Sequence, residues 1–171
     1  MYVMKPIIMS EKDIARFWAK VAAPDPITGC SLWLAGTGED GRYGRFQLKR
    51  KVVYAHRVAL TLALGRQIKE DAWADHKCGV TLCMTLDHLH EASPKENAEN
   101  RRGAQKSSTS GIRGVTWVEN RGMWNVRVGH NRVRYFGGWF DDLEKAEKKA
   151  IQMRNDLFTN NLVDQASPVE A

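Results

Sequence analysis

The fold of the chain is decided by a cysteine- and histidine-rich stretch, residues 75–89, which reads DHKCGVTLCMTLDHL. Within it, four residues separate Cys78 from Cys83 and again Cys83 from His88. One further cysteine, Cys30, lies far upstream at the start of an expected strand. Three thiols and an imidazole suit tetrahedral zinc with a closed shell. The even spacing favours this interpretation over cysteines that merely fill a core, and it predicts a structural zinc ion that clamps two distant segments.

Three polar residues near this stretch offer the groups that phosphodiester hydrolysis requires. Asp75 and His76 precede the first cysteine of the stretch, and Asn97 follows His76 by 21 residues on an expected helix. The reaction needs a base for water and a divalent metal for the leaving oxygen. His76 can be the base, while Asp75 and Asn97 offer the oxygen ligands that magnesium prefers. Arg101 is expected on the helix face of Asn97, where it would hold a phosphate oxygen.

The composition favours a polyanionic partner inside a cell. The 171 residues include 26 basic and 20 acidic side chains, a net charge of +6, and such a balance attracts polyanions. The excess is uneven, since residues 107–140 hold five arginines and one acid. An odd, low number of cysteines argues against a secreted disulfide framework, and no apolar run approaches the roughly 20 residues of a membrane span. We therefore expect an intracellular protein with reduced thiols and no membrane association.

Apolar periodicity and capping residues predict the elements of the first part of the chain. We expect helices at 10–22, 56–64 and 94–102, and strands at 30–33 and 44–54. Ser10 is a candidate N-cap, with Asp13 three residues on as in a capping box. Gly65 is expected to end the second helix, and Pro94 suits the first position of the third.

The second part is expected to be a three-stranded antiparallel sheet packed on one helix. Strand-like runs occupy residues 112–117, 124–129 and 132–140, and Asp141 is the expected cap of a final helix. Its apolar stripe is Leu143, Ala146, Ala150, Met153 and Leu157. We predict a first domain at 1–104, a polar linker at 105–110, the sheet domain at 111–160 and a frayed tail at 161–171.

Around the metal and catalytic residues, the sequence resembles the HNH endonucleases of phages and mobile introns, in the zinc-bound branch close to the His-Cys box homing endonucleases. The matching runs, within about residues 27–102, are 33–34, 41–46, 55–57, 75–78, 83–89 and 93–97. The resemblance implies an α+β chain with a ββα-metal fold and cleavage to 5′-phosphate and 3′-hydroxyl ends. It implies His76 as general base, and Asp75 and Asn97 as ligands of catalytic Mg²⁺ or Mn²⁺.

The same resemblance implies four zinc ligands, namely Cys30, Cys78, Cys83 and His88. Relatives usually carry an asparagine at the position of Thr85, where it braces the loop of the catalytic histidine. Thr85 can still donate and accept one hydrogen bond, so the change affects the rigidity of the loop and removes no catalytic group. His56 is expected to be structural, since it begins an apolar helix.

Residues 111–158 resemble the ethylene-response-factor DNA-binding domain of plants, the APETALA type. The matching residues are Arg113-Gly114-Val115, Trp124, Gly138, Phe140 and the helix that carries Ala146. The resemblance implies a sheet that lies in the major groove of DNA, which admits a narrow sheet surface. Trp124 faces either the DNA or the helix, whereas Arg127 has the opposite parity. The candidate DNA contacts of the whole chain are Arg57, Arg101, Arg113, Arg127, Arg132 and Arg134.

These observations predict a metal-dependent endonuclease of double-stranded DNA with structural Zn²⁺, catalytic Mg²⁺ and no small-molecule cofactor. A phage-encoded protein of this kind would act in the cytoplasm of a bacterial host. One alternative is a zinc-containing DNA-binding regulator with weak or no activity, and the intact Asp75, His76 and Asn97 favour the nuclease over it. Another is a structural zinc protein that binds a second protein, and the arginine-rich residues 107–140 argue against it.

Overall fold

The chain forms two compact units that divide between Asn97 and Ala98 in the computed structural model, which describes residues 6–101 and 103–165. The expected α+β class is confirmed, with a Cys3His cluster in the first unit and a three-stranded sheet on one helix in the second. Residues 105–110, the expected linker, fall within the second unit. Residue 102 and the end of the expected tail, 166–171, lie outside the described residues. No helix in the described part is long and apolar enough to cross a membrane.

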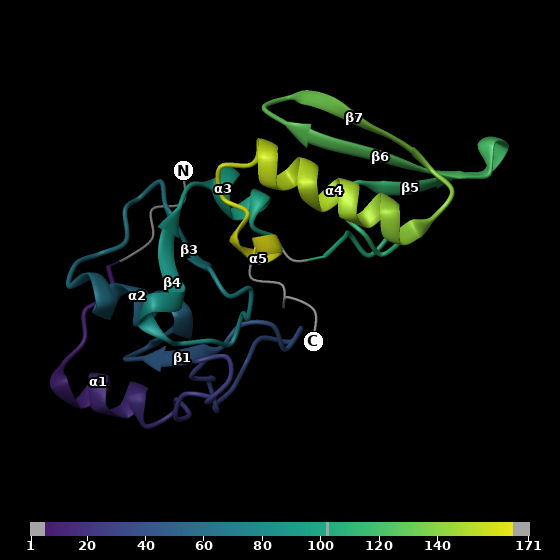
Figure 1. Ribbon diagram of the computed structural model, residues 1–171. Coiled ribbons are helices and arrows are strands. Elements are labelled where there is room, and N and C mark those ends of the chain that lie inside the picture. The colour runs from purple at the N-terminus through teal and green to yellow at the C-terminus, as the bar shows by residue number, and fades with distance from the viewer. Residues whose placement is uncertain (1–5, 102, 166–171) are drawn as a thin grey trace. The chain divides into compact units, whose positions relative to one another are not determined.

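The N-terminal unit contains two small antiparallel sheets, β1-β2 and β3-β4, and the helices between and around them (Figure 1). Its elements are α1 (Glu11–Trp18), β1 (Arg45–Leu48), β2 (Lys51–Tyr54), α2 (Ala55–Leu64), β3 (Trp73–His76), the 3₁₀ turn η1 (Leu86–His88), β4 (Leu89–Ala92) and α3 (Pro94–Glu99), whose last two residues belong to the second unit. The β3-β4 hairpin followed by α3 gives the expected ββα order.

Local signals explain where the first two helices begin and end. Ser10 and Asp13 form the expected capping box at the start of α1. That helix ends at Trp18, short of the expected 22, and Val21 instead bridges to Trp33. Gly65 ends α2 in the left-handed conformation, with φ of 62°.

The single strand expected at 44–54 is wrong, because the chain turns back on itself there. Arg45 pairs with Tyr54 and Leu48 with Lys51, so the segment is a hairpin. Lys49 takes a φ of 54° at the turn, a conformation that non-glycine residues adopt uncommonly. The three consecutive cations 49–51 therefore lie at the hairpin tip.

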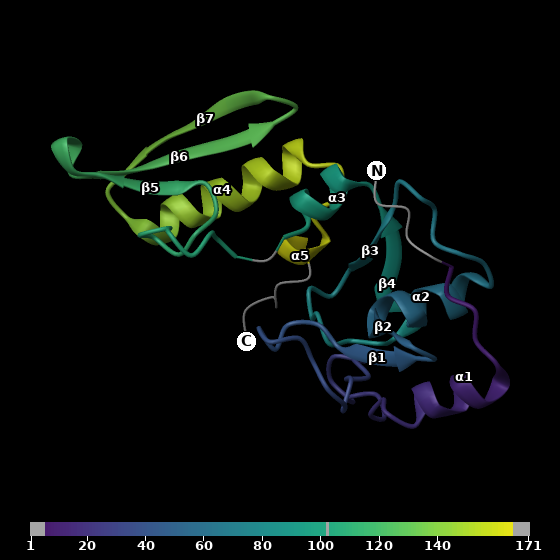
Figure 2. The same cartoon turned by 180° about the vertical axis from the view of Figure 1, so that it is seen from behind.

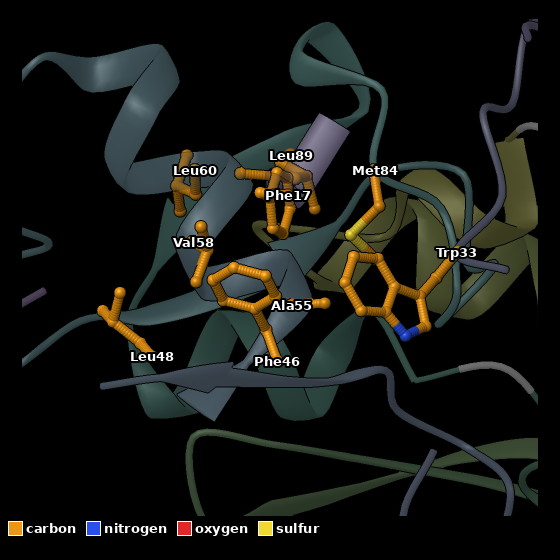
Figure 3. Packing of buried hydrophobic residues seen from close by; sticks show 10 residues of the cluster. Phe17, Trp33, Phe46, Leu48, Ala55, Val58, Leu60, Met84 and Leu89 are labelled. Carbon is orange, nitrogen blue, oxygen red and sulfur yellow. The ribbon is translucent and has the colours of Figure 1, made fainter. Parts of the chain in front are cut away.

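The core of the N-terminal unit combines aromatic and aliphatic side chains in one cluster (Figure 3). Phe17 of α1 lies 5.3 Å from the rings of both Trp33 and Phe46. The amphipathic helix α2 adds its buried face, which includes Ala55, Val58, Ala59 and Leu60. A Cβ on Gly44 would lie 2.6 Å from the Trp33 side chain, so glycine permits this close packing.

The C-terminal unit is a three-stranded sheet in the order β5-β6-β7, with α4 along one face (Figures 1 and 2). Its elements are β5 (Val115–Val118), the 3₁₀ turn η2 (Glu119–Arg121), β6 (Met123–His130), β7 (Val133–Phe140), α4 (Leu143–Leu157) and α5 (Leu162–Gln165). Asp142, one residue after the expected cap, accepts from the backbone of Lys145. Trp124 packs with the core between sheet and helix.

The end of α3 and the residue after it are buried within this C-terminal unit. Glu99 is 7% exposed, and its carboxylate accepts from the Thr159 backbone at 3.0 Å and from the Thr159 hydroxyl at 2.8 Å. Its other oxygen lies 3.1 Å from His130 Nδ1. The buried Asn100 accepts from the backbone of Val163 at 2.9 Å, within α5. Residues 99 and 100 thus tie the start of the unit to its end, where the sequence suggested a frayed tail.

Replacing Glu99 with alanine is expected to destabilise the C-terminal unit by about 3 kcal/mol, because it leaves buried donors without an acceptor. Amide hydrogen exchange along α4 in the full chain measures this change. Glu144→Ala is the matched control, since that carboxylate is 73% exposed and should change stability by less than about 0.5 kcal/mol. Equal exchange in the two variants would contradict the expected role of Glu99.

A fragment that starts at 98 should likewise be more stable than one that starts at 107.

Candidate metal and catalytic site

The four sequence-predicted zinc ligands come together in one cluster. The ligand atoms of Cys30, Cys78, Cys83 and His88 all lie within 4.8 Å of one another. Nδ1 of His88 is 3.6 Å from the Cys30 sulfur and 3.5 Å from the Cys83 sulfur. Sulfur and nitrogen ligands about 2.3 and 2.0 Å from a tetrahedral zinc ion lie about 3.5–3.6 Å apart. The geometry therefore fits zinc with His88 bound through Nδ1.

The thiols of the cluster lie close enough to form a hydrogen bond with one another. The Cys78 thiol donates to the Cys83 sulfur, which lowers the pKa of Cys83 to about 4 and raises the pKa of Cys78. Burial raises the pKa of Cys30. Metal binding requires the thiolate forms, so loading of this cluster releases protons.

The hydroxyl of Thr85 both donates and accepts a hydrogen bond, as expected from the sequence. Its hydroxyl donates to the carbonyl of Gly29 at 2.9 Å and accepts from the backbone of Ser31 at 2.8 Å. Cys30 lies between those two residues, and Leu32 bridges to Cys83 alongside. The strand expected at 30–33 is reduced to isolated bridges at Leu32 and Trp33. Thr85 therefore braces the segment that carries Cys30 against the loop that carries Cys83 and His88.

The catalytic candidates Asp75 and His76 end strand β3, next to the metal cluster. Both are buried, with exposures of 8% and 5%. Nε2 of His76 lies 3.2 Å from the backbone carbonyl of Cys83, to which it can donate. This bond places the proton on Nε2 and leaves the lone pair on Nδ1. Burial is the main reason that the pKa of His76 lies below its ordinary value, so the imidazole is neutral at neutral pH.

Two further histidines adjoin this pair. His90 is the register partner of Asp75 in the β3-β4 hairpin, and its Nε2 lies 3.2 Å from the carboxylate of Asp75. The ring of His56 lies 5.1 Å from that of His76, and burial lowers the pKa of His56 to about 3. Sequence reasoning did not assign His90 a role. Pairing the strands around the metal loop would have placed it opposite Asp75.

Asn97 and Arg101 do not share a helix, contrary to the expectation. Asn97 is half-buried on α3, and its backbone donates to Ser93. The helix ends at Glu99 rather than at 102, so the exposed Arg101 follows it in the C-terminal unit. The expected helix end at residue 102 is therefore wrong. The helix ends at the buried Glu99, and Asn100, which is also buried, no longer belongs to it.

Arg113, a candidate DNA contact, has bonding partners within the C-terminal unit. Its guanidinium donates to the carbonyls of Ala98 at 3.4 Å, Glu99 at 2.9 Å and Arg101. These carbonyls lie at and after the end of α3, and cations are favourable near a helix C-terminus. Burial lowers the pKa of Arg113 to about 10. The side chain thus stabilises the end of α3 and the segment that follows it.

The other candidate DNA contacts of this unit are exposed. Arg127 on β6 pairs with Phe136, and Arg134 on β7 pairs with Gly129. Arg132 lies in the turn before β7 with a φ of 65°, so the strand expected at 132–140 begins one residue later. Arg57 lies half-buried on α2 in the N-terminal unit.

Comparison with known proteins finds similarity in the N-terminal unit and the first residues after it. Residues 53–99 match a family model described as HNH endonuclease. A 61-residue region is 42% identical to Protein 3.8 of Escherichia phage T7 and makes up 36% of this chain. The chain spans about half the length of that curated relative. No solved structure matches the chain.

Proposed function

We propose that the chain is a metal-dependent endonuclease that hydrolyses DNA to 5′-phosphate and 3′-hydroxyl ends, because residues 53–99 match a family model described as HNH endonuclease. The observation that carries this proposal is the arrangement of Asp75 and His76 at the end of β3, beside the Cys3His cluster. A DNA-binding regulator would not need a buried imidazole with its proton fixed on one nitrogen.

His76 is the general base of the proposed reaction. Its bond to the Cys83 carbonyl orients the ring, and the lone pair on Nδ1 accepts a proton from the attacking water. The position of the Cys83 carbonyl depends on the metal cluster, because Cys83 itself is one of its four ligand residues. The proposed structural zinc therefore orients the base without taking part in the chemistry.

Asp75 and Asn97 supply oxygen atoms of the kind that Mg²⁺ or Mn²⁺ prefers. Such an ion, when bound, stabilises the negative charge on the leaving 3′ oxygen. His90 donates to Asp75 and fixes the direction of its carboxylate, as residues behind a metal ligand commonly do. Asp75 and Asn97 are thus the proposed ligands of the ion, and His90 orients the carboxylate of Asp75.

Double-stranded DNA is the proposed substrate, and the C-terminal unit is a proposed second contact with it. Arg127 and Arg134 are exposed on the sheet, so Coulombic attraction to phosphates supports this assignment. The similarity to a phage protein supports action in the cytoplasm of an infected bacterium, and the HNH domain is compatible with a homing role.

Replacing His90 is expected to weaken the binding of the catalytic metal ion. In a nicking assay on supercoiled plasmid DNA, His90→Ala should raise the Mg²⁺ concentration for half-maximal cleavage by about 10–100-fold, since the direction of Asp75 is no longer fixed. His90→Asn, which can still donate a hydrogen bond, should show a smaller rise. Plasmid that stays intact with the unmodified protein at every Mg²⁺ concentration would contradict the proposed function, and an unchanged Mg²⁺ requirement in His90→Ala would contradict only the role of His90.

A further inference from the structure

A basic groove runs along the β1-β2 hairpin of the N-terminal unit. It encloses about 1550 Å³ between the hairpin, helix α2 and residues 6–8 and 67–70. Its lining includes one acid, Glu70, and six cations, namely Arg45, Lys49, Arg50, Lys51, Arg57 and Lys69. Among the described residues, no ion pair neutralises any of these cations.

Two polar groups on the wall of this groove lack partners. The half-buried guanidinium of Arg57 makes no hydrogen bond or ion pair within the described part of the chain. Thr61 is 8% exposed, and its hydroxyl is likewise without a partner there. Since the two residues are one helical turn apart on α2, they lie on the same face of the helix. Burying a hydroxyl without a partner is costly, and the neighbouring guanidinium carries positive charge, so the pair indicates a ligand that accepts hydrogen bonds and carries negative charge.

The groove also adjoins the catalytic histidine through a chain of rings. Tyr54 lines the groove, and its ring is 5.6 Å from that of His56. The His56 ring is in turn 5.1 Å from that of His76. Arg45 lies 4.2 Å above the Tyr54 ring and holds it in place. An anion bound in the groove would therefore lie near the proposed site of hydrolysis.

We propose that this basic groove binds the phosphodiester backbone of the DNA next to the cleaved bond, with Arg57 and Thr61 donating to one phosphate. Phosphate oxygens accept from a guanidinium in pairs and from hydroxyls. The exposed cations at the hairpin tip, residues 49–51, bind the phosphates that follow. The proposal rests on the proposed function for the identity of the polyanion. It assigns the groove as the element that positions the substrate backbone for the base.

The test measures DNA binding apart from cleavage. All variants carry His76→Ala and are titrated, without Mg²⁺, against a fluorescent 30-base-pair duplex of random sequence. Lys49→Glu with Lys51→Glu should weaken the affinity at least about tenfold and lower the slope of log Kd against log salt by about two. Lys12→Glu with Lys20→Glu makes the same change of charge outside the groove and should weaken affinity less than about twofold. Equal losses in the two pairs would overturn the proposal.

Thr61→Val separates a binding role from a structural one. Removal of an unpartnered buried hydroxyl should leave the melting temperature unchanged or higher. The same variant should bind the duplex about three- to tenfold more weakly if the hydroxyl donates to a phosphate. Arg57→Ala should lose more affinity than Arg57→Lys, which keeps the charge but not the planar fork. Unchanged affinity in Thr61→Val and Arg57→Ala would overturn the proposal, even if the unmodified protein cleaves DNA.

Discussion

Replacing His76 with alanine is expected to lower the rate of DNA cleavage by about 10²–10⁴-fold, the contribution that a positioned general base usually makes. Affinity for DNA should change little, because binding depends mainly on phosphate contacts spread over the surface. The measurement is a single-turnover cleavage assay beside a binding titration of the same preparation.

A second variant controls for loss of folding caused by His76→Ala, since His76 is buried and its ring contacts that of His56. His76→Gln keeps an amide that can donate to the Cys83 carbonyl but has no basic nitrogen. It should retain bound zinc and the melting temperature while losing activity to the same extent. Cleavage by either variant at the rate of the unmodified protein would show that another group is the base.

Loss of the metal cluster is expected to unfold the N-terminal unit. Structural zinc contributes an apparent 10–16 kcal/mol or so in small domains, which is as large as the whole stability of most proteins. Cys83→Ser, or a strong chelator, should therefore abolish hydrogen-exchange protection in α2 and β3. Protection in α4 should persist, because that helix has a separate core.

Thr85→Val is the matched control for this prediction. It removes the hydrogen bonds to Gly29 and Ser31 and leaves all four ligands, so the expected loss is only about 1–3 kcal/mol. Native mass spectrometry of the dialysed protein should find one zinc ion per chain. A metal-free protein whose melting temperature is unaffected by Cys83→Ser would contradict a structural zinc site.

Local signals predicted the elements whose ends depend on neighbouring residues. The Ser10-Asp13 capping box and Gly65 mark helix ends through bonds or conformations that a few residues determine. The Cys3His cluster could also be predicted, because only a few side chains bind zinc and their spacing is regular. The hairpin at 45–54 could not, since its tip at Lys49 and Arg50 lacks the glycine or asparagine typical of tight turns.

Contacts between distant segments account for what the sequence did not reveal. Glu99 and Arg101 favour a helix, yet bonds from Thr159, Val163 and Arg113 hold this run in another conformation, and α3 ends at Glu99. His90 gains its role from strand register, which places it opposite Asp75. Arg57 and Thr61, which have no hydrogen-bond partner among residues 6–101 and 103–165, become informative only when their surroundings are known. No sequence pattern records a missing partner.

Mapping the ends of cleaved DNA tests the central claim most directly. The zinc-loaded protein is incubated with genomic DNA and Mg²⁺, and the new termini are sequenced with and without prior phosphatase treatment. The proposed hydrolysis predicts 5′-phosphate and 3′-hydroxyl ends that disappear on chelation of Mg²⁺ and with His76→Gln. Intact DNA at every Mg²⁺ concentration, with tight binding by the same folded protein, would contradict a nuclease and identify a DNA-binding protein instead.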